Sequence, residues 1–303
     1  MGKIKHLLRN RNVILCLALL LGLLLPQAAE WTRHLTLPAL ALVMSLSTMG
    51  VSGTLFRSPR SLIIPAILGI LMSYGVLAGF ILGMSAIIIN EEEIWKGFVI
   101  LAVVPPAVAV IPFTELLKGN RTYSLVGIIG AYLGALIIMP LILLKSLGST
   151  SFYLERLSII ALVLIVAPLI ISRILLWKNV DRELEPIKGV ITNWCFFVVV
   201  YTIVGLNQDI FIRQPLTLAP VAAIAILSTF FLGLIIELIG RLFRIDPKIT
   251  TSLVLLGTIK NYGLAGGIAL ALFSKHTALP ATVSTIFMFV YLIWLGIKGR
   301  STH

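Results

Sequence analysis

Two residues that could do ion or substrate chemistry stand side by side in an apolar stretch. Residues 249–273 are mostly apolar, yet Lys260 and Asn261 lie in their middle. A charged side chain in the hydrocarbon region is costly, so it usually faces a cavity, carries a function or has a partner on another helix. Gly257 and Gly263 flank the pair, and glycines allow a helix to break and free its backbone groups. The pattern predicts one half of a transport site.

The composition of the chain indicates a membrane protein. Of its 303 residues, 59% are hydrophobic and 12% charged, and the mean hydropathy is +1.07. A soluble domain is about 25% charged. The net charge of +12 sits in short connections between apolar runs, which favours basic cytoplasmic loops over nucleic-acid binding. We find no catalytic, metal, nucleotide or cofactor motif, so we expect neither an enzyme nor a cofactor.

The apolar runs predict ten transmembrane helices, because a span needs about 20 residues. The expected spans are residues 12–29, 35–54, 61–86, 95–117, 122–145, 156–177, 187–206, 215–240, 249–273 and 279–297. The polar connection 178–188 is the candidate joint between two halves.

The distribution of basic residues predicts the orientation. With the N-terminus inside, cytoplasmic segments hold 17 of the 24 Lys and Arg, the opposite loops hold 6, and Lys260 is the remaining one. This satisfies the positive-inside rule and places both termini in the cytoplasm, as in a bacterial inner-membrane protein. The basic N-terminus, the apolar run 13–25 and residues 26–29 also resemble a secretory signal. Removing the first span would disrupt the charge pattern, so we expect that span to be retained.

The chain also contains a pseudo-repeat. The fourth and ninth spans are both interrupted, the fourth by Pro105, Pro106 and Pro112 and the ninth between Gly257 and Gly263, roughly 150 residues apart. Five spans per copy, about 12–145 and 156–297, is an odd number, so the second copy must be inverted. Matching interruptions in inverted halves point to a transporter's binding site. Ordinary helix kinks are the alternative.

Three segments resemble the bile acid:sodium symporter (BASS) family. They are TLFRSPRS (54–61), PPAVAVIPFTELLKGN (105–120) and KNYGLA (260–265), in the family's order and spacing but in degenerate form. The resemblance implies a ten-helix fold of two inverted five-helix repeats. Helices 1, 2, 6 and 7 would form a panel and helices 3–5 and 8–10 a core, with broken helices 4 and 9 crossing at the substrate and ion site.

The departures from the family pattern fall on its ion ligands. The family's Ser-Asn sodium ligands fall on Val110 and Ile111, its shared glutamate on Leu256, its helix-9 glutamine on Lys260, and its helix-3 glutamine near Gly69. Hard cations need several oxygen ligands, and these substitutions remove most of the side-chain ones. We therefore do not expect sodium or any other metal to bind here.

Lys260 suggests a replacement for the missing ion. An ammonium at the sodium position could supply a permanent positive charge, or could switch it by releasing a proton, because lysine changes its protonation readily when buried. The carrier would then be proton-coupled or passive. The alternative is a structural tether, paired with backbone carbonyls or with Glu115. Glu115 would lie either near Lys260 or at the cytoplasmic mouth beside Lys118.

Four polar residues near the interruptions are the expected substrate ligands. Asn261 matches the crossover asparagine, which in the family faces the substrate cavity, although it could equally cap the broken helix. Thr114, Thr258 and Tyr262 could line the same cavity, or simply pack. The expected function is secondary transport of a small organic anion or metabolite by alternating access. The alternative is a membrane sensor or scaffold that keeps the fold without transporting.

Overall fold

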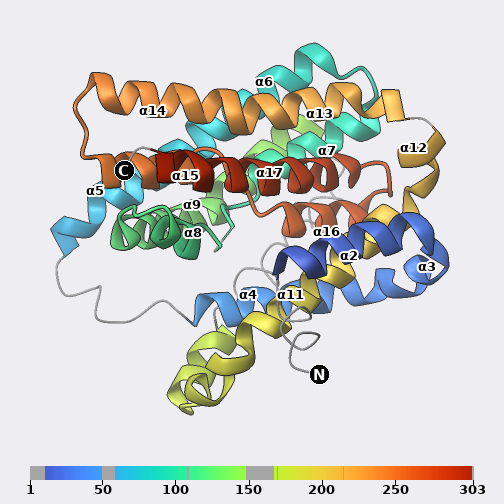
Figure 1. Cartoon of the computed structure of the whole chain (residues 1–303), viewed down its shortest axis with the longest axis horizontal. Helices are drawn as coiled ribbons and strands as arrows, with labels where there is room; N and C mark the ends of the chain where they lie inside the picture. The colour runs from blue at the N-terminus through green and yellow to red at the C-terminus, as the bar shows by residue number, and fades with distance from the viewer. Residues whose placement is uncertain are drawn as a thin grey trace.

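The computed structural model describes residues 11–49, 59–107, 109–147, 167–168, 170–213 and 215–301. Within these ranges every regular element is helical, which confirms the all-helical expectation (Figure 1). The helices of the first half are α2 (Arg11–Leu24), η1 (Pro26–Ala28), α3 (Ala29–Thr32), η2 (Arg33–Leu35), α4 (Thr36–Thr48), α5 (Pro59–Ile70), η4 (Leu71–Ala78), α6 (Gly79–Ile88), α7 (Glu92–Val103), α8 (Val110–Leu116) and α9 (Arg121–Leu147).

The second half of the chain is also built from helices. They are α11 (Asp181–Leu206), α12 (Gln208–Arg213), η5 (Pro215–Leu218), α13 (Ala219–Ile226), η6 (Leu227–Phe231), α14 (Leu232–Leu242), α15 (Pro247–Leu256), α16 (Tyr262–Leu272) and α17 (Leu279–Ser301). Two elements, η4 in the first half and η6 in the second, are π-helical turns inside longer helices, a geometry that is often found at functional sites.

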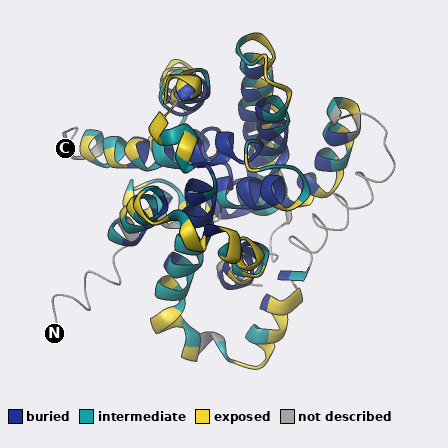
Figure 2. Cartoon of the chain, turned by 90° about the vertical axis from the view of Figure 1, so that its right-hand side faces the viewer, coloured by how far each residue is buried: buried dark blue, intermediate teal, exposed yellow. Residues whose placement is uncertain are grey.

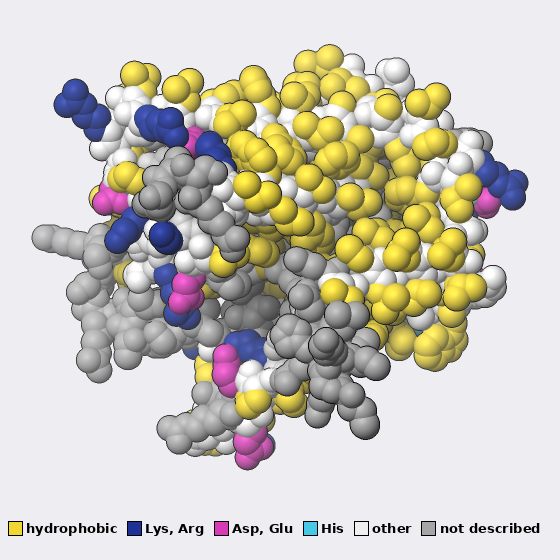
Figure 3. Space-filling model, viewed as in Figure 1, with side chains coloured by type: hydrophobic (Ala, Val, Ile, Leu, Met, Phe, Trp, Pro, Cys, Tyr) yellow, Lys and Arg dark blue, Asp and Glu magenta, His cyan; other side chains and the backbone are white. Residues whose placement is uncertain are grey.

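The helices are those of an integral membrane protein. Among the described residues, five are long and apolar enough to cross a membrane, and a sixth is possible if the pair 13–24 and 26–46, bent by 93°, counts as one span. Among the described residues, the side chains across the upper and right-hand part of the face in Figure 3 are mostly hydrophobic, and charged ones lie at the left, at the right edge and at the bottom. That all ten predicted segments cross the bilayer remains a prediction.

Most of the ten predicted segments coincide with helices. Segments 95–117 and 249–273 are each split into two short helices, as their interruptions predict. Segment 156–177 lies largely outside the described residues, as does the beginning of the motif at 54–61. The first segment belongs to the folded structure, because α2 packs along α11 and the Tyr201 hydroxyl donates to the Leu25 carbonyl at 2.7 Å.

The described helices pack in two groups. Helices α2, α3 and α4 pack on α11 and lie below the rest in Figure 1. The larger group contains α5–α9 and α13–α17 with their π-turns. The smaller group meets the larger one chiefly through α16, which contacts both α4 and α11. Buried residues gather toward the centre of the molecule (Figure 2), and most residues of α7, α15 and α16 are buried.

Candidate functional site

The first break separates α7 from α8. Pro105 and Pro106 have no backbone N–H to donate to α7, and a proline disfavours helical geometry in the residue before it. Val104 accordingly adopts an extended conformation, with φ −66° and ψ 148°. Helix α8 begins at Val110, so Pro112 lies in its first turn, where the missing N–H costs no intrahelical bond. The interruption therefore ends before Pro112, earlier than the sequence pattern suggests.

The second break separates α15 from α16 without any proline. Gly257 is the C-cap of α15, and Asn261 is the N-cap of α16, where its side-chain oxygen accepts from the Leu264 N–H at 3.1 Å. Such a cap satisfies one of the free donors at a helix start. Gly263 is already the second residue of α16, so this break covers residues 257–261. Asn261 therefore caps the broken helix, as one of its two expected roles predicts.

The two breaks contact each other directly. The backbone N–H of Asn261 donates to the Pro105 carbonyl at 3.0 Å, and the Lys260 ammonium donates to the Val104 carbonyl at 3.0 Å. Helix α7 lies beside α16, and α8 lies beside α15. Each break thereby satisfies backbone groups that the other leaves without helical partners, which is what buried non-helical backbone requires.

Lys260 is fully buried at this contact. Its Nζ lies 2.9 Å from the Ser73 hydroxyl oxygen and 4.3 Å from the centre of the Tyr74 ring. The Val104 carbonyl belongs to the C-cap of α7, the negative end of that helix dipole, and an aromatic face also attracts a cation. Among the described residues no carboxylate lies within 4.0 Å of the ammonium. The positive charge is held by neutral groups alone.

Glu115 is not among the partners of Lys260. It lies near the end of α8 with 63% of its side chain exposed, and its Oε2 is 3.6 Å from the Arg121 guanidinium. Its carbonyl accepts from the N–H of Lys118 at 3.1 Å. Of the two positions expected for Glu115, the described contacts correspond to the exposed one beside Lys118. Direct pairing with Lys260, the other alternative, is not among the described contacts, and a role of Glu115 in ion coupling stays a prediction.

The four expected substrate ligands are buried and bonded within the protein. The Thr114 hydroxyl donates to the Val110 carbonyl at 2.8 Å, and the Thr258 hydroxyl to the Val254 carbonyl at 2.7 Å. The Tyr262 hydroxyl donates to the Thr258 carbonyl at 3.2 Å, and the Asn261 amide to the Met44 sulfur at 3.2 Å. Only Asn261 reaches across to the smaller helix group, because Met44 belongs to α4.

Sequence reasoning missed the groups that surround Lys260 and Asn261. Ser73 and Tyr74 come from the π-turn η4, Met44 from α4, and Tyr132, whose hydroxyl donates to the Met44 sulfur at 3.5 Å, from α9. A usable signal existed for the tyrosines. Membrane-protein tyrosines concentrate at the interfaces, so Tyr74 and Tyr132 stand out in the middle of predicted spans.

The two glycines of the second break each permit a close approach, but on opposite sides. A Cβ on Gly257 would lie 2.6 Å from the terminal methyl of Met72, inside the larger group. A Cβ on Gly263 would lie 3.0 Å from the ring of Phe196 on α11 and 3.4 Å from Leu40 on α4. The break therefore sits where the two helix groups meet.

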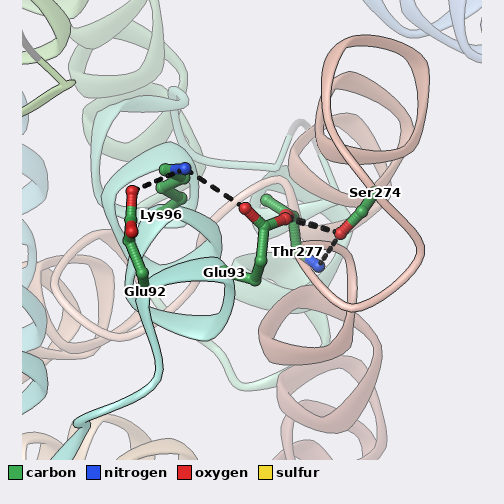
Figure 4. Close-up of polar contacts among 5 residues, drawn as sticks. All are labelled: Glu92, Glu93, Lys96, Ser274 and Thr277. Atoms are coloured by element: carbon green, nitrogen blue, oxygen red, sulfur yellow. Dashed lines mark hydrogen bonds and ion pairs between the residues drawn. The ribbon is translucent and has the colours of Figure 1, made fainter.

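The N-terminal turn of α7 is fastened by what we term the carboxylate clamp: Glu93, Ser274 and Thr277. Both hydroxyls donate to the Glu93 carboxylate at 2.7 Å, and Lys96 donates to it at 3.1 Å (Figure 4). The hydroxyl of Ser274, then that of Thr277, stabilises the ionised form and lowers the pKa of Glu93 to about 2. The clamp ties α7 to the loop that joins α16 and α17.

The N-terminal part of α15 is fastened by what we term the amide clamp: Asn120, Lys248 and Ser252. The Asn120 N–H donates to the Lys248 carbonyl at 2.9 Å, and the Ser252 hydroxyl donates to the Asn120 carbonyl at 3.0 Å. This clamp ties α15 to the loop between α8 and α9. Each broken segment is thus held, near the start of its first half-helix, by the loop that follows the other segment.

The described residues contain no group of three or more His, Cys, Asp or Glu that could hold a metal ion. Comparison with protein-family models gives no match for this chain, and no curated protein matches it.

Proposed function

We propose that this protein is a secondary transporter of a small organic anion. It would work without sodium by alternating access, as a divergent relative of the bile acid:sodium symporters in a bacterial inner membrane. The observation that carries the proposal is Lys260, a fully buried ammonium at the contact of two broken helices, without a carboxylate in reach among the described residues. Burying a charge without a counter-charge is costly, and an anionic ligand is one way to offset that cost.

The internal correspondence of the two halves supports the inverted-repeat architecture. The π-turns begin at Leu71 and Leu227, 156 residues apart, and the breaks begin at Val104 and Gly257, 153 residues apart. The two clamps add a third matching pair. Two kinds of irregularity that recur at nearly one spacing are hard to attribute to independent kinks, and matched irregular segments are typical of transporter binding sites.

The surroundings of Lys260 support a lysine in the role of the bound cation. It supplies positive charge where side-chain oxygen ligands are missing, and its hydrogen bonds go to the Ser73 hydroxyl and the Val104 carbonyl, oxygen atoms of the kind that bind hard cations. Two versions remain open. A lysine that stays protonated makes the carrier passive, whereas one that releases its proton couples transport to protons.

A membrane sensor or scaffold is the second candidate, and one observation favours it. The polar groups of all four expected substrate ligands are engaged within the protein. A carrier must release such contacts during its cycle, whereas a scaffold never needs to.

Flux through proteoliposomes tests the proposal. The full chain is reconstituted, and uptake of labelled mono- and dicarboxylates is followed across pH, with and without sodium. We expect uptake that does not require sodium and that Lys260→Gln and Lys260→Ala reduce by more than about tenfold. Lys188→Gln is the matched control, because Lys188 is paired with Glu185 on α11, away from the breaks.

The pH profile separates the two versions. If Lys260 exchanges its proton, the wild-type rate varies with pH and the Gln variant loses that variation. If Lys260 keeps its proton, the variant is slow at every pH. Flux and pH dependence that both survive the substitution would contradict the role given to Lys260, a sodium requirement would contradict the ion chemistry, and absence of flux for every anion would favour the scaffold.

A further inference from the structure

The donors beside Lys260 are paired with an unusually weak acceptor. The Asn261 amide and the Tyr132 hydroxyl both donate to the Met44 thioether sulfur, at 3.2 and 3.5 Å, and all three side chains are buried. A thioether accepts hydrogen bonds weakly, whereas a carboxylate oxygen accepts strongly. Two good donors therefore point to the same sulfur atom. If a carboxylate oxygen took the place of this sulfur, both hydrogen bonds would become stronger.

A third buried donor lies in this region. The Tyr74 hydroxyl has no hydrogen-bond partner among the described residues, although its ring lies against the Lys260 ammonium. Leaving such a hydroxyl unpaired in a buried position destabilises the folded protein. Buried unpaired groups are rare in folded proteins and call for a reason, such as a ligand that pairs them.

The charge and the shape of the region limit the ligand. Lys260 is the only buried cation among the described residues, so it neutralises a single negative charge, and a dianion would leave one charge uncompensated. One turn along α4 from Met44 lies Leu40, which with Phe196 packs against the start of α16. These neighbouring side chains are apolar, Leu40 buried and Phe196 partly buried, which is the chemistry that a hydrocarbon tail requires.

We infer that Tyr74, Tyr132 and Asn261 form a carboxylate-binding group for a monocarboxylate with an apolar tail, in which the Met44 sulfur gives way to a carboxylate oxygen. The inference rests on the proposed function and specifies its substrate class. Tyr74, Tyr132 and Met44 would be specificity-determining residues, and Lys260 would balance the charge.

Ligand-induced thermal stabilisation of the purified full-length protein tests the inference. The probes are hexanoate, its neutral isostere hexanamide, and the dicarboxylate succinate. We expect hexanoate to raise the melting temperature saturably, and hexanamide and succinate to leave it unchanged. Tyr74→Phe removes a hydroxyl that has no partner, so we expect it to fold normally while its apparent affinity for hexanoate falls about tenfold, the loss of one hydrogen bond to a charged group.

Tyr291→Phe is the matched control. The Tyr291 hydroxyl is also buried and without a hydrogen-bond partner, but it lies against Gly233 of α14. Both variants therefore remove the same group from the same kind of environment. We expect Tyr291→Phe to bind hexanoate as the wild type does. A purely structural role for the Tyr74 hydroxyl predicts that the two variants behave alike.

The possible outcomes are distinguishable from those of the transport test. Equal hexanoate affinity in Tyr74→Phe and wild type, or equal stabilisation by hexanamide and hexanoate, overturns the inference. If Lys260-dependent flux of some anion is measured alongside either result, the proposed function survives and only this substrate class fails. If the wild type neither binds nor moves any of the anions, both proposals fail.

Discussion

The two breaks at the centre of the molecule have different causes. The break between α7 and α8 contains Pro105 and Pro106, so its interruption is enforced by covalent structure. The break between α15 and α16 has a full set of backbone donors, and it is held open by the Asn261 cap and by contacts with the first break. The first is fixed locally, whereas the second depends on its neighbour. Disturbing the first should therefore disturb both, and the reverse should not hold.

The largest expected effect comes from replacing the prolines. Pro105→Ala with Pro106→Ala lets α7 continue, which draws the Val104 and Pro105 carbonyls toward helical bonds and takes acceptors away from Lys260 and Asn261. A buried charge that loses its partners costs about 3–5 kcal/mol. We expect a loss of stability of that order, measured by thermal unfolding in detergent. Pro112→Ala, in the first turn of α8, is the control and should change stability little. Equal losses of stability in the two variants would contradict the idea that the second break depends on the first.

A smaller effect is expected from closing the second break alone. Gly257→Ala places a Cβ 2.6 Å from the Met72 terminal methyl and 2.7 Å from the Ile236 δ-methyl, both ends of flexible side chains. Such overpacking costs about 1–3 kcal/mol. Gly83→Ala in α6, where a Cβ meets nothing within 4 Å, should be neutral or stabilising in the same unfolding assay. A Gly257 variant less stable than the double proline variant would reverse the hierarchy of the two breaks.

Much of this arrangement could be predicted from sequence, because the breaks depend on the types of residue at the breaks themselves. Prolines, glycines and a lone lysine in apolar runs were sufficient to locate both breaks. The exact limits differ, because whether Pro112 and Gly263 interrupt a helix depends on their position in the turn. Similarly, the ion pair between Glu237 and Arg241 has the i,i+4 spacing that is typical of pairs within one helix.

The partners of the site could not be predicted in the same way. Ser73 lies 187 residues from Lys260, and Met44 lies 217 residues from Asn261, so no local pattern links them. Glu115 shows the same dependence. The sequence left it either near Lys260 or at the mouth beside Lys118, and its exposed position near the end of α8, beside Arg121, corresponds to the second alternative. Such pairings depend on tertiary packing.

The smallest expected effect distinguishes the clamps that hold the two broken segments. The pKa of the Glu93 carboxyl group is about 2, below its ordinary value of 4.5. The ionised side chain therefore contributes fully to folding stability above pH 4.5, and this contribution is lost as the pH falls through 2. We expect Glu93→Gln to cost about 1 kcal/mol at neutral pH, since the carboxylate is partly exposed, and the difference from wild type to vanish toward pH 2.

The amide clamp provides the comparison. Ser252→Ala removes uncharged hydrogen bonds, so a deficit of about 1 kcal/mol should persist at every pH at which the protein folds. Unfolding curves of both variants over the same pH range measure the difference. Parallel pH profiles would show that the charge on Glu93 adds nothing to its clamp.

The link between Lys260 and the Val104 carbonyl has an electrical consequence. Because the breaks are joined to each other, any movement of the two broken segments would carry the Lys260 side chain with them. A unit charge that crosses the full membrane potential exchanges about 2.3 kcal/mol per 100 mV. Under the proposed function, the unloaded protein would move a positive charge through part of that field. The protein loaded with a monocarboxylate would move none, so voltage would act on the return step alone.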